Sequence, residues 1–103
     1  MLEINDDNLA EIIASNDKVM VQYGATWCGQ CRMVRPKIEK LSQEIDNVKF
    51  YYVDAEKYPE SRKLANVSNL PAFAAFKDGK LSGERMGTRI EKIREIVDEI
   101  TSN

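Results

Sequence analysis

Two cysteines stand three residues apart in the segment Cys28-Gly29-Gln30-Cys31, and the sequence contains no others. At this spacing on the first turn of a helix the two thiols share a face, so a disulfide can form with little backbone movement. The pair can therefore alternate between a dithiol and a disulfide. The chain has no histidine, which excludes histidine-based triads, histidine metal sites and the usual proton shuttle near neutral pH. Thiol–disulfide exchange is the chemistry that these residues favour.

The two cysteines should differ in their roles. At a helix N-terminus the unpaired backbone amides and the helix dipole favour an anion, and therefore a thiolate. Cys28 comes first and gains most from this effect, so we expect it to be the nucleophile. Cys31 lies inside the helix, where poor access suits a resolving thiol that attacks only after a mixed disulfide has formed.

Two other interpretations of the cysteine pair compete with a redox role. The cysteines could be inert core residues, but chance rarely places two of them at this spacing directly between a strand and a helix. A zinc or iron–sulfur site needs about four ligands, which one pair cannot supply without a second chain. A redox pair is the favoured interpretation, and we expect no metal and no bound cofactor.

The segments around the pair predict a central strand followed by a long helix. Residues Lys18 to Tyr23 are almost continuously apolar, which is typical of a strand covered on both faces and central in its sheet. From Gly29 to about Ile45 the apolar residues recur along one helical stripe. Pro36 lies inside this stripe and predicts a kink near the helix start rather than a break.

The remaining elements complete an α/β pattern. They are a thin strand at Leu2 to Ile4, a short helix in the region Asn5 to Ser15, a strand at Val48 to Val53, a weaker helix from Glu56 to about Asn66, and a C-terminal helix with Ile90, Ile93, Ile96, Val97 and Ile100 on one face. An Asp-Gly pair between the runs Ala72 to Phe76 and Leu81 to Met86 predicts a hairpin. We expect one mixed central sheet, three parallel strands plus an antiparallel C-terminal hairpin, with helices on both faces.

Length and composition bound the function. A chain of 103 residues is expected to form a single domain, residues 1–103. The net charge of -2, with no basic block, argues against nucleic acid as a ligand. No apolar run approaches the roughly 20 residues of a membrane span, and the acidic N-terminus is unlike a secretory signal. We therefore expect a cytoplasmic monomer without a membrane partner.

The cysteine pair belongs to a larger set of residues spread along the chain: Ala25, Trp27, Cys28, Gly29, Cys31, Pro36, Asp54, Pro71, Gly79 and Gly87. With this set the sequence resembles the thioredoxin family over essentially the whole chain. The resemblance implies a thioredoxin fold and a protein-disulfide reductase in which Cys28 attacks and Cys31 resolves. It implies that Pro71 is a cis proline facing the disulfide. It also implies two kinds of partner, thioredoxin reductase or an equivalent electron donor, and disulfide-containing client proteins.

The resemblance further implies a shallow docking surface beside the disulfide. Its substrate-binding residues would be Trp27, Gly29, Gln30, Leu70, Pro71, Gly87 and Thr88, with the backbone of Leu70 offered to an extended client segment. Ordinary packing for Trp27 and a simple turn role for Gly87 remain open alternatives. We expect Asp54 to cap a helix rather than to take part in catalysis.

The sequence departs from the family at four positions. Gln22 replaces a buried aspartate that assists proton transfer to and from the buried thiol, and Phe50 replaces its accompanying lysine. Glutamine can form hydrogen bonds but cannot accept a proton, so we expect a stable protein with a slowed resolving step. Gln30 replaces a proline, which implies a weaker reductant. Gly24 replaces a common tryptophan and should leave less bulk beside the helix.

These departures keep two alternatives open. One is a disulfide isomerase or weak oxidant with the same fold. The other is a binding or assembly subunit in which redox activity is incidental.

Overall fold

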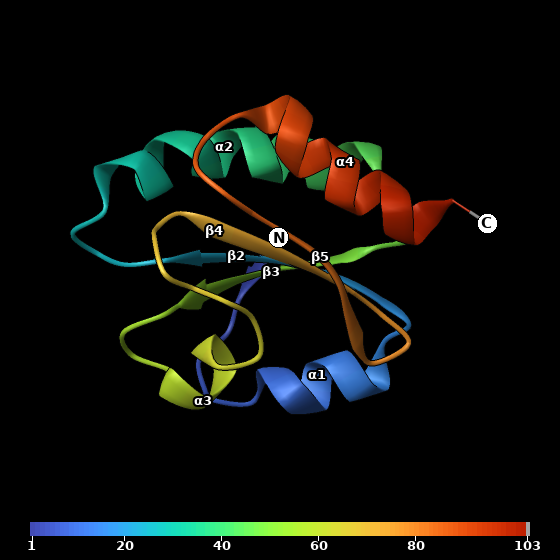
Figure 1. Cartoon of the computed structure of the whole chain (residues 1–103), viewed down its shortest axis with the longest axis horizontal. Coiled ribbons are helices and arrows are strands. Elements are labelled where there is room, and N and C mark those ends of the chain that lie inside the picture. The colour runs from blue at the N-terminus through green and yellow to red at the C-terminus, as the bar shows by residue number, and fades with distance from the viewer. Residues whose placement is uncertain (103) are drawn as a thin grey trace.

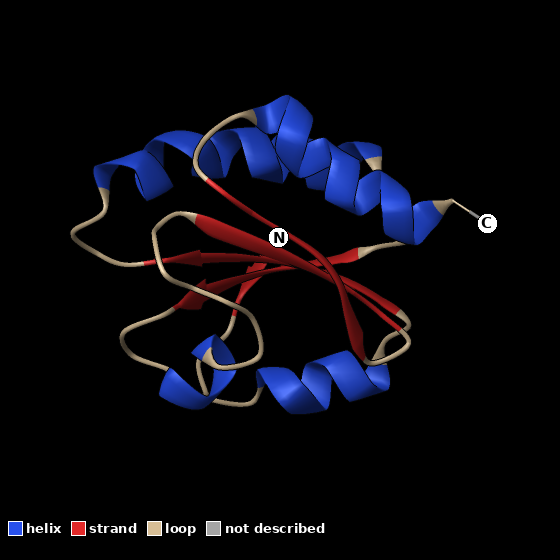
Figure 2. Cartoon of the chain, in the orientation of Figure 1, coloured by secondary structure: helices blue, strands red, loops and turns tan. Residues whose placement is uncertain are grey.

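The computed structural model describes residues 1–102 and shows a mixed sheet between two layers of helices (Figure 1). Figure 2 distinguishes the helices, the strands and the loops that join them. The elements are β1 (Leu2–Glu3), α1 (Leu9–Ser15), β2 (Lys18–Gly24), α2 (Gly29–Glu44), β3 (Lys49–Asp54), α3 (Pro59–Arg62), β4 (Ala72–Lys77), β5 (Lys80–Met86) and α4 (Ile90–Thr101). Within residues 1–102, no helix has the length and apolar character that crossing a membrane requires.

The five strands lie in the order β1-β3-β2-β4-β5. Strands β1, β3 and β2 are parallel, β4 runs antiparallel to β2, and β5 runs antiparallel to β4. The predicted fold class is confirmed, with three parallel strands extended by an antiparallel hairpin. Strand β2 is central, with β3 on one side and β4 on the other. Functional sites of α/β sheets commonly lie beyond the carboxyl ends of such strands.

Each face of the sheet is covered by two helices, α2 and α4 on one side and α1 and α3 on the other (Figure 1). Alternate residues of β2 face opposite sides, so Val21 joins the core under α1 and α3 while Met20 joins the core under α2 and α4. This two-sided burial explains the continuous apolar run in β2. Gln22 is the exception, a polar side chain in the same strand with none of its surface exposed.

Two local predictions hold in the structure. Helix α2 runs through Pro36 without a break, as expected, while the kink near its start stays a prediction. Asp78 and Gly79 form the two-residue turn of the β4–β5 hairpin with φ angles of 52° and 82°. Positive φ at both positions is what this tight turn requires, and Asp-Gly supplies it at low cost.

Helix α3 is shorter than the sequence pattern predicted. Instead of extending from Glu56 to about Asn66, it contains four residues that begin at Pro59. The Asp54 Oδ1 atom accepts hydrogen bonds from the backbone of Glu56 and Lys57 at 3.0 and 3.1 Å and stabilises a separate turn before the helix. Pro59 has no N–H group, so it suits the first helical position. Asp54 therefore caps this turn and not α3, whose N-cap is Tyr58.

Helix α1 begins at Leu9, because the chain before it forms a loop held by Asp7. The Oδ1 atom of Asp7 accepts from the backbone and the hydroxyl of Ser61 at 2.7 and 2.6 Å, and Oδ2 accepts from the backbone of Glu60 at 3.0 Å. Desolvation raises the pKa of Asp7, but these hydrogen bonds from Ser61 and Glu60 outweigh it and hold the pKa below its usual value.

We expect Asp7→Asn to lower the melting temperature at neutral pH and to have little effect in acid. The folded-state pKa is the lower one, so the carboxylate stabilises the fold above about pH 4 and loses this effect as the pH falls further. Thermal unfolding of both proteins between pH 7 and pH 3 measures the difference. A difference that stays constant over this range would contradict the prediction.

Candidate active site

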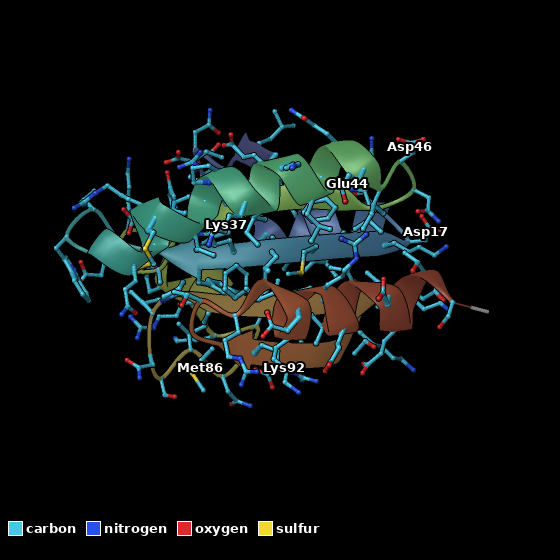
Figure 3. All side chains as sticks on the ribbon, turned by 90° about the horizontal axis from the view of Figure 1, so that it is seen from above. Asp17, Lys37, Glu44, Asp46, Met86 and Lys92 are labelled. Atoms are coloured by element: carbon cyan, nitrogen blue, oxygen red, sulfur yellow. A yellow bond between two sulfur atoms is a disulfide. The ribbon has the colours of Figure 1, made fainter. Side chains whose placement is uncertain are left out.

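The predicted cysteine pair forms a disulfide at the N-terminus of α2. The yellow bond between two sulfur atoms in Figure 3 lies at this end of the helix. The Cα atoms of Cys28 and Cys31 are 5.3 Å apart, well within the range for an unforced bridge. Cys28 is the N-cap residue, and its Sγ accepts a hydrogen bond from the backbone N–H of Cys31 at 3.1 Å.

A tight turn leads from β2 into the helix and fixes the position of the pair. The backbone N–H of Cys28 donates to the carbonyl of Ala25 at 3.1 Å. The guanidinium of Arg32 reaches back to the carbonyl of Thr26 at 2.6 Å. These two hydrogen bonds tie the loop after β2 to the first turn of α2. The sheet and the helix together therefore determine where Cys28 lies.

The two sulfur-bearing residues differ in burial. Cys28 is 5% exposed and Cys31 is fully buried. Both belong to a small cluster with Ala25, and Leu70 packs against this cluster from the loop before β4. A reagent in solution can therefore reach the pair only at Cys28.

The Leu70–Pro71 peptide bond is cis, and Pro71 is buried. The carbonyl of Pro71 accepts a hydrogen bond from the backbone N–H of Gly87 at 3.0 Å. Gly87 has a φ of 103°, a conformation that residues with a Cβ atom rarely adopt. The backbone conformation alone therefore requires glycine at this position, which supports the interpretation of Gly87 as a turn residue.

Trp27 lies beside the disulfide with 64% of its surface exposed. Its indole Nε1 donates a hydrogen bond to the Glu56 carboxylate at 2.6 Å, so its position is held by a polar contact rather than by packing. Glu56 was not among the predicted site residues. A signal was present, because β2 and β3 are neighbouring parallel strands and the loops after their carboxyl ends meet at one edge of the sheet.

The remaining predicted docking residues occupy the same end of the sheet with fewer contacts. Gly29 and Gln30 are exposed on the first turn of α2, and Thr88 is half-buried after Gly87. Met86 is also 51% exposed at the end of β5, and its sulfur lies 3.3 Å from the Ser68 hydroxyl. Figure 3 labels this side chain.

Gln22 contacts the buried half of the pair. Its Nε2 donates to the backbone carbonyl of Cys31 at 3.1 Å, while its Oε1 is buried and has no hydrogen-bond partner within residues 1–102. Phe50 is buried in the apolar core under α2 and α4. The acid and the lysine of the family pattern are thus replaced by a neutral amide and a hydrocarbon ring.

The expectation of less bulk at Gly24 is wrong, because the ring of Tyr52 fills that space. A Cβ atom on Gly24 would lie 2.7 Å from the ring Cζ and 3.0 Å from Cε2, and it would also contact the hydroxyl. The guanidinium of Arg35 stacks on the Tyr52 ring, 4.2 Å from its centroid. Arg35 is itself held by Glu3 and Glu39 at 3.2 and 3.3 Å.

We expect Gly24→Ala to destabilise the fold by about 1–3 kcal/mol, because the clamped tyrosine ring cannot move away from the added methyl group. In a Tyr52→Leu background the same substitution should cost clearly less, since the obstructing ring is gone. Urea unfolding of the four proteins measures the coupling between the two sites. Strictly additive effects would show that the ring is not the obstacle.

The sequence and the fold are both similar to those of known proteins. A model of the thioredoxin family matches residues 1–99. The chain is 38% identical over 91 residues to mitochondrial thioredoxin-3 of Saccharomyces cerevisiae, covering 82% of this chain and 72% of that protein. It is 36% identical over 88 residues to thioredoxin of Homo sapiens, covering 84% of each. The X-ray structure of Fasciola hepatica thioredoxin is similar with a TM-score of 0.88 and 32% identity, covering 97% of this chain and 99% of that one.

The fold, the disulfide and these similarities define a protein-disulfide oxidoreductase, which acts by thiol–disulfide exchange. The chain belongs to the thioredoxin family.

Proposed function

We propose that the protein reduces disulfides of client proteins, with Cys28 attacking and Cys31 resolving. The supporting observation is the unequal burial of the two cysteines, with only Cys28 reaching the surface. The Cys28 thiolate attacks a client sulfur, forms a mixed disulfide and releases one client thiolate. The deprotonated Cys31 then attacks the Cys28 Sγ, forms the Cys28–Cys31 disulfide and releases the second thiolate. The client gains the two electrons that the pair loses.

We propose that clients bind at the shallow surface around the disulfide. Leu70 supports this because its backbone N–H and carbonyl make no hydrogen bond within residues 1–102, so they can pair with an extended client segment. The other contributors are the residues that share this end of the sheet: Trp27, Gly29, Gln30, Pro71, Gly87 and Thr88. A surface that binds mainly the backbone of its client depends little on client sequence, so it suits a protein with many clients.

We propose further that residues 1–103 act as one domain, a monomeric electron carrier in the cytoplasm, and that thioredoxin reductase or an equivalent donor recharges it. One relative is a mitochondrial thioredoxin, so subcellular fractionation is the direct test of location. Recovery of the protein in the mitochondrial fraction would overturn the cytoplasmic assignment.

The reduction potential of the Cys28/Cys31 couple tests the direction of electron flow. We would equilibrate the protein in dithiol buffers, follow Trp27 fluorescence and verify the result by thiol trapping. A reduction potential of about −270 mV, the value typical of thioredoxin, supports a reductase. A reduction potential of about −180 mV, the value typical of protein disulfide isomerase, would overturn the reductase proposal in favour of an isomerase.

An isomerase is the second candidate because of Gln30. Its backbone N–H, in the first turn of α2, has no hydrogen-bond partner within residues 1–102. A proline at this position would have no N–H at all. A free donor near Cys28 stabilises the thiolate and therefore the reduced form.

We expect Gln30→Pro to shift the equilibrium with glutathione about tenfold towards the disulfide, which is about 30 mV more negative for a two-electron couple. Gln30→Ala keeps the backbone N–H and should leave the potential unchanged. Redox equilibration of the three proteins measures both effects. An alanine variant that shifts as far as the proline variant would assign the effect to the side chain instead.

A further inference from the structure

Gln22 holds a buried acceptor that the oxidised protein leaves unpaired. The side chain has no exposed surface, and its Nε2 donates to the Cys31 carbonyl at 3.1 Å. The Oε1 atom of the same amide is buried and has no hydrogen-bond partner within residues 1–102. Buried polar atoms of native proteins nearly always find a partner, so this atom requires an explanation.

The surroundings of Gln22 offer few donors. It projects from the centre of β2 towards α2, where the neighbouring core side chains are hydrocarbon, among them Val34 and Phe73. Tyr52 lies opposite Gln22 in the neighbouring strand and carries a hydroxyl group, but the structure has no hydrogen bond between the two side chains. The residue that Gln22 does contact is Cys31, whose sulfur changes its hydrogen-bonding capacity with redox state.

Reduction of the disulfide adds a hydrogen-bond donor to Cys31. The disulfide takes up two electrons and two protons in forming two thiols, and the Cys28 proton is lost to solvent wherever that residue is a thiolate. Cys31, whose backbone carbonyl already accepts from the Gln22 amide, then carries an S–H group, and an S–H group is a weak donor. We propose that the Cys31 thiol of the reduced protein donates to Gln22 Oε1, so that Gln22 is paired only in the dithiol state and biases the couple towards it.

This role differs from that of a buried acid. A carboxylate would remove the proton from the resolving thiol, whereas the neutral amide holds the proton in place. Gln22 therefore adjusts the redox equilibrium through a hydrogen bond that one redox state lacks. The inference requires only that the disulfide can be reduced, so it stands whether the protein acts as a reductase or as an isomerase.

The first test is the redox equilibrium of Gln22→Leu. Leucine removes both the unpaired acceptor of the oxidised form and the bond of the reduced form. We expect the equilibrium with glutathione to move about tenfold towards the disulfide, which is about 30 mV more negative. Tyr52→Phe is the matched control, because it removes the other nearby hydrogen-bonding group and should leave the equilibrium unchanged. An unchanged equilibrium in Gln22→Leu, or an equal shift in Tyr52→Phe, would overturn the proposal.

The second test observes the thiol directly and does not depend on the Gln22 variant folding. In Cys28→Ser the remaining thiol belongs to Cys31, so its S–H stretching band can be assigned in the infrared spectrum. We expect this band at lower frequency than that of a thiol without a hydrogen bond, and we expect it to move up when Gln22→Leu is added. A band at the position of an unbonded thiol in Cys28→Ser itself would refute the inference.

Discussion

Cys28→Ser is expected to abolish disulfide reduction, whereas Cys31→Ser should form mixed disulfides that persist. The first substitution removes the only thiol that reaches the surface, so the rate with a disulfide substrate such as insulin should fall by on the order of 1000-fold or more. The second leaves the attack intact but removes the group that releases the client. Non-reducing electrophoresis should show a covalent adduct with Cys31→Ser and none with Cys28→Ser.

The opposite pattern, adducts with Cys28→Ser alone, would reverse the two proposed roles.

The double variant Cys28→Ser, Cys31→Ser adds a separate test, because it has no thiol left. If the double variant retained the full biological role of the protein in cells, redox chemistry would be incidental and a binding or assembly role would replace the reductase proposal. Both serine variants preserve side-chain size closely, so a general loss of folding is not expected.

Gln22→Asp should shorten the lifetime of the mixed disulfide by about 100-fold. A positioned general base contributes about 10²–10⁴ to a proton transfer, and Gln22 already lies against Cys31, its Nε2 3.1 Å from that residue's carbonyl. In the present chain a neutral amide occupies this position, so water or the departing client thiolate must take the proton. The resolving step, not the first attack, is therefore the step that the substitution should accelerate.

An aromatic disulfide reagent separates the two steps, because one coloured thiolate leaves when Cys28 attacks and a second leaves when Cys31 resolves. The second phase should accelerate in Gln22→Asp while the first stays close to wild type. Gln22→Asn is the matched control, since it has nearly the shape of aspartate without its acid. Equal second phases in the aspartate and asparagine variants would show that proton transfer does not limit this step.

Much of the active site could be predicted from local sequence. The spacing of Cys28 and Cys31 between an apolar run and a helical stripe indicated both the disulfide and its position, because chain neighbours on one helical turn must lie close together. The Asp78-Gly79 turn was equally local, since φ preferences belong to individual residues. The resemblance to thioredoxins added the cis bond at Pro71, which neither composition nor spacing could indicate.

Local pattern was less reliable where backbone hydrogen bonds compete. The stretch after β3 has helical character, but the side chain of Asp54 stabilises a turn there and Pro59 delays the start of α3. Side-chain bonds of this kind offer the backbone an alternative to helix, and apolar spacing does not reveal which alternative is the more stable.

Strand order indicates which loops meet at one edge of the sheet, but the individual side-chain contacts between distant segments lay beyond the sequence, because they depend on packing. Only the tertiary structure shows that Glu56 holds the indole of Trp27, and that the Tyr52 ring fills the space beside Gly24. Only the tertiary structure shows, too, that Gln22 donates to the Cys31 carbonyl while its Oε1 stays unpaired within residues 1–102. The sequence by itself determined the chemistry, the fold class and the cysteine pair that forms the disulfide, since these follow from residue type and short-range spacing. The tertiary structure decided the environment of those residues, since burial and hydrogen-bond partners arise only when segments far apart in the chain pack together.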